Sequence, residues 1–335
     1  MKISNYYKKL GYEVSLKLDY RNLEDFSKVF IGKVFTDNVV PREVLKFSNV
    51  EYGGTGFFYD KAPNLPNIIE HALPDYDLYS KCKDFSNASI GFLTRGCFRK
   101  CSFCVHRRYE RSFQASDLNE FLDKDKKYIT FLDDNFLAFP KWKEILMKVK
   151  ATGKPFQFIQ GLDIRLLNEE KAKEFASAKY HGDYIFAFDD IKDKELIETK
   201  LRLWRKYSKK STKLYLFCAY DKANNYDEVF WANDIRDLFE RIKVLMEYDC
   251  LGYVMRYTLY KDSPYEKLYI NIARWVNQPS FYKKMSYRDF CSKNQSRMKS
   301  DRACSALKSL REFESKYPEH SYLFDLEYNQ MKMTK

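Results

Sequence analysis

The sequence predicts a mixed α/β protein made of six strand–helix units, with a small α/β unit before them and a helical extension after them. Three observations predict this fold class. Six short apolar runs recur between residues 88 and 257, helical patterns separate them, and neither end of the chain continues the spacing. Six units can form an open sheet or a partial TIM-type (βα)6 barrel, whereas a complete barrel needs eight. The predicted domains are residues 1–80, 81–260 and 261–335.

The six apolar runs are nearly continuous rather than alternating, which is typical of strands buried on both faces. They cover residues 88–94, 128–132, 156–160, 184–188, 214–219 and 252–257. Trp142, Ile145 and Val149 lie on one helical face after Pro140, which suits a first helical turn. Asn168 is a good N-cap for the next helix, and Ile235, Leu238, Phe239, Ile242 and Leu245 form the clearest apolar stripe. Alternating strands and helices predict a parallel sheet.

The two ends of the chain have different patterns. We expect a helix over residues 2–10, strands over 13–18 and 29–31, a glycine-rich turn at 53–56 and a proline-containing linker up to about residue 80. The last 60 residues are predicted to be helical, with Ser300 and Asp301 as candidate caps of one helix.

Composition excludes several classes of protein. The chain has 335 residues, of which 45% are hydrophobic and 32% charged, and it holds 27 Phe and 27 Tyr, so general disorder is excluded. No window approaches the length of an uncharged membrane span, and the N-terminus has no signal-peptide core, so we expect a cytoplasmic protein without membrane contact. In a reducing compartment, clustered cysteines indicate a metal site or catalysis rather than disulfides.

Three of the eight cysteines, Cys97, Cys101 and Cys104, follow the first predicted strand with the spacing C-x3-C-x2-C. Thiolates suit iron–sulfur clusters and zinc. Three protein ligands for the four irons of a cluster leave one iron open to a substrate. This count indicates a site that carries out chemistry rather than one that stores iron. Two alternatives remain: a structural zinc site with His106 as fourth ligand, and an electron carrier in which a scattered cysteine completes the ligand set.

This motif, with Phe103 before the last cysteine and a strand directly before the loop, resembles the radical S-adenosylmethionine superfamily over about residues 85–260. The resemblance implies that Cys97, Cys101 and Cys104 hold a [4Fe–4S] cluster whose open iron binds S-adenosylmethionine. It implies a partial TIM-type barrel and reductive cleavage that gives a 5′-deoxyadenosyl radical, which abstracts hydrogen from a substrate. It also implies a one-electron reductant such as flavodoxin or ferredoxin. Neither the substrate nor a catalytic residue beyond the cofactor is identified.

The resemblance assigns further residues at the ends of predicted strands, where parallel sheets bind ligands. It implies that the methionine ammonium is bound after the second strand, that the methionine carboxylate could pair with Arg165, and that an acidic residue after the fourth strand binds ribose. The candidate cofactor-binding residues are Asp133, Asp134, Asn135, Gln160, Asp163, Arg165 and Asp189. The second-strand segment departs from the Gly-Gly-Glu form common in the family.

The N-terminal part resembles a reduced form of the cobalamin-binding domain found in one branch of the superfamily. That branch carries a cobalt-binding histidine in an Asp-x-His-x-x-Gly motif that this sequence lacks, so cobalamin is possible but not expected. The net charge is +12, and residues 280–316 hold ten basic against four acidic side chains. RNA or DNA binding by this basic part is therefore possible. The alternative function is a non-catalytic nucleic-acid-binding protein with a structural zinc site.

Overall fold

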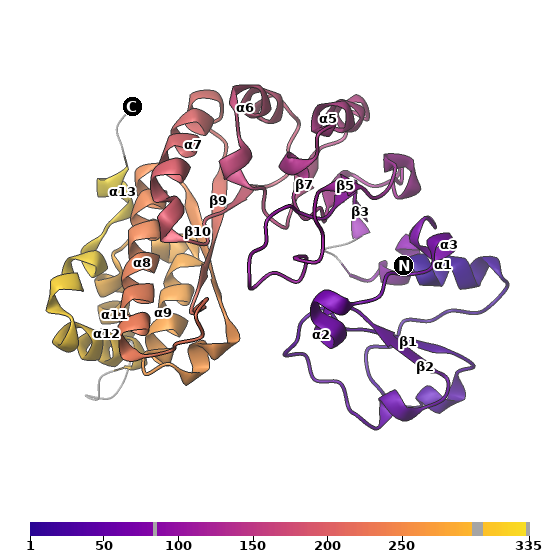
Figure 1. Ribbon diagram of the computed structural model, residues 1–335, viewed down its shortest axis with the longest axis horizontal. Helices are drawn as coiled ribbons and strands as arrows, with labels where there is room; N and C mark the ends of the chain where they lie inside the picture. Colours follow the sequence, from indigo (N-terminus) through magenta and orange to yellow (C-terminus); the bar gives the residue numbers. More distant parts are fainter. Residues whose placement is uncertain (83–85, 297–303, 333–335) are drawn as a thin grey trace. The chain divides into compact units, whose positions relative to one another are not determined.

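The computed structural model describes residues 1–82, 86–296 and 304–332. The chain divides into two compact units, Met1–Phe156 and Gln157–Lys335. Both contain helices together with parallel strands, which confirms the mixed α/β class (Figure 1). All six expected strands are present. They belong to two three-stranded sheets, with the orders β3-β6-β7 and β10-β9-β8, so the six-unit partial barrel stays a prediction.

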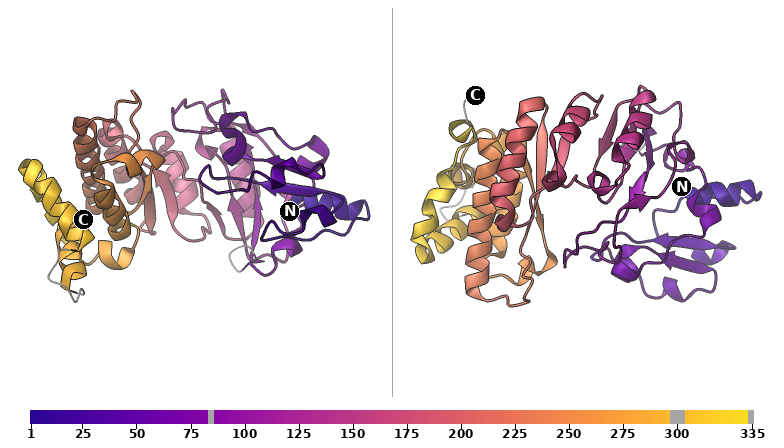
Figure 2. Two further views of the ribbon diagram at one scale, coloured as in Figure 1. Left: turned by 90° about the horizontal axis from the view of Figure 1, so that it is seen from below. Right: turned by 45° about the horizontal axis from the view of Figure 1, so that its top comes forward.

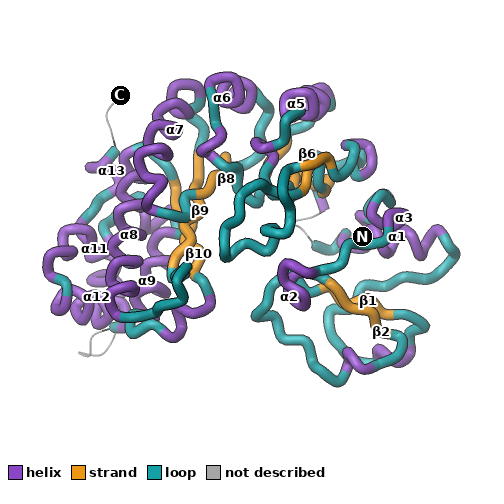
Figure 3. The backbone as a smooth tube through the Cα atoms, viewed as in Figure 1, coloured by secondary structure: helices purple, strands orange, loops and turns teal. Residues whose placement is uncertain are grey.

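The first unit begins with a small α/β arrangement. Helix α1 (Lys2–Lys9) and strand β1 (Val29–Gly32) lie where the sequence predicts them, and β1 pairs in parallel with β2 (Val50–Gly53). Short helices α2 (Thr55–Phe58) and α3 (Asn67–Glu70) follow, and much of this part is loop (Figure 3). The strand expected over residues 13–18 is wrong. That segment is mostly exposed and has no strand assignment, because apolar residues form a strand only where a neighbouring strand takes their main-chain hydrogen bonds.

The second part of this unit carries a parallel sheet. Strand β3 (Ala88–Gly91) pairs with β6 (Tyr128–Phe131), and β7 (Phe156–Phe158), of which only Phe156 belongs to this unit, completes the order. Helix α5 (Trp142–Ala151) begins two residues after Pro140 and buries its apolar face through Trp142, Ile145, Leu146 and Val149, as its periodicity predicts. A hairpin that the sequence did not predict follows β3. Strand β4 (Thr94–Arg95) pairs antiparallel with β5 (Phe113–Gln114).

The second unit is built on three parallel strands, β8 (Tyr184–Ala187), β9 (Thr212–Cys218) and β10 (Leu251–Arg256). Its helices are α6 (Glu169–Ala176), α7 (Lys194–Tyr207) and α8 (Glu228–Glu247), of which α8 packs along β9 and β10 (Figures 1 and 2). Asn168 caps α6 by accepting a hydrogen bond from the Lys171 N–H, as predicted. Burial along β9 alternates, so only one face of this strand is fully buried, where we expected two.

The C-terminal part is helical, as predicted. Its helices are α9 (Glu266–Val276), α10 (Pro279–Tyr282), α11 (Tyr287–Ser296), α12 (Ser305–Lys316) and α13 (Tyr328–Met331). Phe239 of α8 contacts the rings of Trp275, Tyr287 and Phe324, which joins this part to the core of the second unit. The predicted caps Ser300 and Asp301 lie outside the described residues. Across residues 1–82, 86–296 and 304–332, no helix is both long enough and apolar enough to pass through a bilayer.

Candidate functional site

The three clustered cysteines lie on a loop closed at its base by the β4–β5 hairpin. Thr94 pairs with Gln114, and Arg95 pairs with Phe113, so residues 96–112 leave and re-enter the fold at one point. Gly96 opens this loop with φ +83°, and a Cβ atom at this position would lie 2.4 Å from the carbonyl oxygen of Arg111. Glycine is required here because both the dihedral angle and the close approach exclude a side chain.

The thiols of Cys97, Cys101 and Cys104 are partly exposed, and none of the eight cysteines forms a disulfide. They lie close enough to act on one another electrostatically. Burial, together with the neighbouring Cys101, Cys97 and Asp134, raises the pKa of the Cys104 thiol to about 11, against the effect of the His106 N–H. Without a metal, the Cys104 thiol keeps its proton at neutral pH. A cation that binds the three sulfurs would favour the thiolates and release protons.

Hydrogen-bond donors point at two of the sulfurs. The Arg99 N–H lies 3.4 Å from Cys97 Sγ, and the His106 N–H lies 3.4 Å from Cys104 Sγ. Asn135 Nδ2 lies 3.2 Å from Cys97 Sγ. Donors of this kind stabilise negative sulfur and tune iron–sulfur clusters. The sulfurs of Cys97 and Cys104 therefore accept hydrogen bonds, as thiolate ligands of a metal do.

Two sequence-predicted residues, Asp134 and Asn135, lie beside this loop. The Asp134 side chain is 5% exposed, accepts a hydrogen bond from the Gly96 N–H at 2.6 Å and has Oδ1 3.2 Å from Nε2 of His106. Asn135 is buried, and its Oδ1 has no hydrogen-bond partner within the described part of the chain. A buried acceptor without a donor is costly, so this oxygen is suited to accept a hydrogen bond from a bound ligand.

Asp133, the third member of this predicted group, has both carboxylate oxygens committed to the loop entrance. Oδ1 accepts from the Leu93 N–H at 3.0 Å, and Oδ2 accepts from the Thr94 N–H at 2.6 Å and the Thr94 hydroxyl at 2.7 Å. These bonds tie the segment between β3 and β4 to the end of β6. Asp133 thus positions the cysteine loop, a role that its strand-end location could not distinguish from ligand binding.

Asp133 also makes stability depend on pH. Burial outweighs the hydrogen bonds and raises the pKa of Asp133 to about 7. Because the folded state keeps this proton longer than the unfolded state does, its contribution is complete below about pH 4 and is lost as the pH rises through about 7. We expect the free energy of unfolding of wild type to exceed that of Asp133→Asn by more at pH 5 than at pH 8. Urea unfolding at both values measures this difference.

The exposed Asp125→Asn is the control for this prediction, and its difference from wild type should be the same at both pH values. A difference for Asp133→Asn that stayed constant or grew from pH 5 to pH 8 would contradict the assigned direction.

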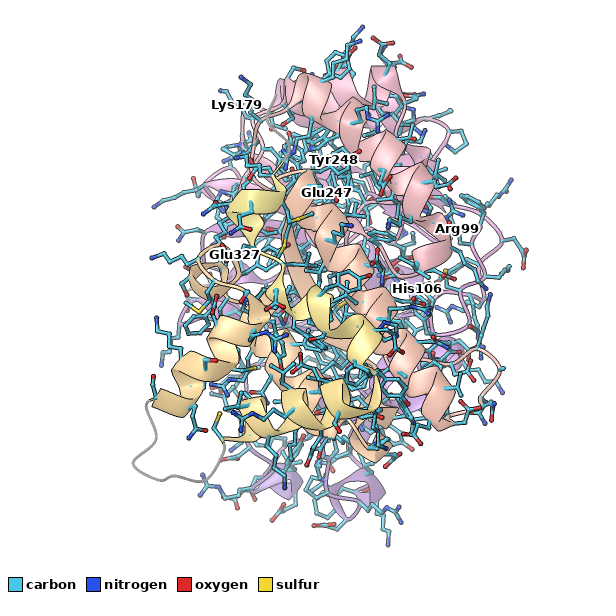
Figure 4. All side chains as sticks on the ribbon, turned by 90° about the vertical axis from the view of Figure 1, so that its left-hand side faces the viewer. Arg99, His106, Lys179, Glu247, Tyr248 and Glu327 are labelled. Atoms are coloured by element: carbon cyan, nitrogen blue, oxygen red, sulfur yellow. The ribbon has the colours of Figure 1, made fainter. Side chains whose placement is uncertain are left out.

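A segment of the N-terminal part holds the outer side of the cysteine loop. The Tyr59 hydroxyl donates to the Phe103 carbonyl oxygen at 2.8 Å, and Arg107 Nε donates to Asp60 Oδ2 at 2.7 Å. Arg108 donates to the Ala62 carbonyl oxygen at 2.6 Å. Arg107 and Arg108 of the loop therefore bind acceptors within the first unit. Arg99 and His106, labelled in Figure 4, belong to the same loop.

Within the described residues, no three His, Cys, Asp or Glu side chains gather closely enough to hold a single metal ion. A four-iron cube is larger than one ion, and its three thiolates stand at separate corners rather than around one centre. His106 Nε2 faces Asp134, so a zinc site that included His106 would use its other ring nitrogen, Nδ1.

The other predicted cofactor-binding residues belong to the second unit. Arg165 donates from Nε to Asp163 Oδ1 at 2.7 Å and from Nη1 to Asp193 Oδ2 at 2.6 Å, so two carboxylates engage this guanidinium. Gln160 is exposed. The charges of Arg241, Arg165 and Asp163 act on the Asp189 carboxyl, so Asp189 lies near the Arg165–Asp163 pair.

Asp189 follows the carboxyl end of β8, and its Oδ1 is buried without a hydrogen-bond partner among the described residues. Burial raises the pKa of Asp189 to about 6, against the effect of Arg241. Arg241 is a residue that the sequence reasoning missed. It is 2% exposed and donates from Nη1 to the carbonyl oxygens of Phe188, Asp189 and Phe217. The sequence signal that could have identified Arg241 is its position next to the apolar stripe of α8.

No protein-family model matches the chain, and no curated protein matches it.

Proposed function

We propose that the protein is a radical S-adenosylmethionine enzyme in which Cys97, Cys101 and Cys104 hold a [4Fe–4S] cluster. The proposal includes the six-unit partial TIM-type barrel that the sequence predicts. The observation that carries it is the C-x3-C-x2-C loop, which follows a parallel strand and has an N–H donor on the sulfurs of Cys97 and Cys104.

The residues around the loop fit such a group. Asn135 donates to Cys97 Sγ and so stabilises negative charge on that sulfur. Six basic residues lie between residues 95 and 111, and three of them, Arg95, Lys100 and Arg107, already pair with carboxylates. Asp133 and the β4–β5 hairpin fix the point at which the loop begins.

When bound, the cluster supplies one electron for reductive cleavage of S-adenosylmethionine to methionine and a 5′-deoxyadenosyl radical that abstracts substrate hydrogen. This chain's residues bind and orient the reactants. The buried, unpartnered Oδ1 of Asn135 is suited to accept from the methionine ammonium group. In the second unit, the unpartnered Oδ1 of Asp189 is suited to accept from a ribose hydroxyl.

The test is release of 5′-deoxyadenosine from S-adenosylmethionine by protein reconstituted anaerobically with iron and sulfide and reduced with dithionite. Wild type should release it, and Asp189→Asn should need a higher concentration of S-adenosylmethionine while holding the same amount of iron. The exposed Asp190→Asn is the matched control at the next residue. Iron-loaded, reduced wild type that released none would contradict the proposal, and so would a preparation with one zinc and no iron.

A further inference from the structure

The carboxyl edge of the sheet in the second unit concentrates buried polar atoms that lack partners. The described residues of this unit contain four such atoms, and the two on charged side chains are Asp189 Oδ1 and Arg256 Nη1. Asp189 follows β8, and Arg256 is the last residue of β10. Parallel sheets bind ligands at this edge, so unused polar atoms here indicate an occupant.

Arg256 is a partly exposed arginine at this edge, and its Nη1 has no hydrogen-bond partner among the described residues. Cys218 pairs with Arg256 in the sheet register. The charges of Asp234, Arg241 and Arg256 act on the Cys218 thiol. Asp234 offsets Arg241, and its Oδ2 accepts from the Ala219 N–H at 2.8 Å and the Tyr269 hydroxyl at 2.7 Å. The Arg256 guanidinium stacks on the Tyr260 ring at 4.4 Å, which orients it but does not neutralise it.

The neighbouring backbone is strained, and aromatic rings surround it. Ala219, directly after β9, has φ +63°, a left-handed conformation that is uncommon for alanine and that clusters at ligand sites. Tyr257, directly after Arg256, packs against Tyr220 at 4.9 Å and Phe217 at 6.2 Å between ring centroids. All three rings are partly exposed.

We propose that Arg256 binds the anionic group, a carboxylate or a phosphate, of a small molecule. A guanidinium offers paired donors to either oxyanion, and one that is partly desolvated by its surroundings gains most from such a partner. That this molecule is the enzyme's substrate rests on the proposed function. Anion binding itself does not need the cluster.

The test uses the full chain and ligand-observed NMR titration with benzoate and phenyl phosphate, and with benzamide as the uncharged comparison. Wild type should bind at least one of the anions at least about tenfold more tightly than benzamide. Arg256→Gln should lose this preference, and Arg256→Lys should weaken it because an ammonium cannot form the paired contact. Arg274→Gln is the matched control, since Arg274 is an exposed arginine of the same unit with a ring, Phe290, at 6.0 Å.

Equal binding of both anions and benzamide by wild type would overturn the proposal, and so would a full preference in Arg256→Gln. Circular dichroism identifies a variant that does not fold. In that case folded Arg256→Lys decides, because undiminished preference in it also overturns the paired contact. A chain that binds the anion but takes up no iron keeps this inference and removes the proposed function. A chain that takes up iron and cleaves S-adenosylmethionine but shows no anion preference keeps the proposed function and removes this inference.

Discussion

Cys101→Ala should hold almost no iron after anaerobic reconstitution with iron and sulfide, whereas wild type should hold about four irons per chain. Cys101 is the middle ligand of the loop, and the two remaining thiols cannot hold three corners of a cube. The variant should also lose the brown colour and the visible absorption of an iron–sulfur protein. Iron and acid-labile sulfide, measured per chain, give the result directly.

Cys82→Ala is the matched control for this prediction. Cys82 belongs to the same unit, is also partly exposed and lies outside the loop, so its removal should leave the iron content unchanged. If both variants retained full iron, or if both lost it equally, the loop would not be the ligand set. Equal thermal stability of the two variants without iron would show that neither change acts through folding.

Arg241→Met should lower the free energy of unfolding by about 3 kcal/mol or more, because each buried carbonyl oxygen left without its donor costs about 1–3 kcal/mol. The substitution keeps most of the side-chain volume. It leaves the carbonyl oxygens of Phe188, Asp189 and Phe217 without their donor, and it leaves Asp234 buried without a cation. Urea unfolding measures the change.

Arg236→Met is the control on the same helix. The Arg236 side chain is 40% exposed and pairs with the adjacent Asp237, so its loss should cost about 1 kcal/mol or less. Asp234→Asn should recover part of the loss in the Arg241→Met background, because it removes the unpaired charge and keeps an oxygen for Ala219 and Tyr269. Equal costs at positions 236 and 241, or strictly additive costs in the double variant, would contradict the charge pairing.

Local patterns predicted most elements of the fold. The apolar runs gave the six strands, and periodicity with capping residues gave α5 and α6, because both signals reside in neighbouring residues. The failures required information from distant residues. Residues 13–18 are apolar enough for a strand, but they pair with no strand among the residues that the structure describes. The β4–β5 hairpin joins residues 18 and 20 positions apart through strands of two residues, which are too short to show a sequence pattern.

The candidate site was predictable by residue but not by role. Spacing identified the three cysteines, and strand ends identified Asp133, Asn135 and Asp189. Only coordinates separate Asp133, whose oxygens hold the backbone, from Asn135 and Asp189, each of which has an oxygen without a partner. Arg241 and Arg256 were missed because an arginine within an apolar pattern is normally a solvated side chain that extends from the core.

We propose that the thiols of Cys97, Cys101 and Cys104 hold a [4Fe–4S] cluster and leave one iron open to S-adenosylmethionine. Electron paramagnetic resonance of the dithionite-reduced wild-type protein, recorded with and without S-adenosylmethionine, tests it most directly. The reduced wild-type protein should give the signal of a [4Fe–4S] cluster whose g-values shift when S-adenosylmethionine is added. A cluster signal that S-adenosylmethionine leaves unchanged, or a protein without any cluster signal, would contradict it.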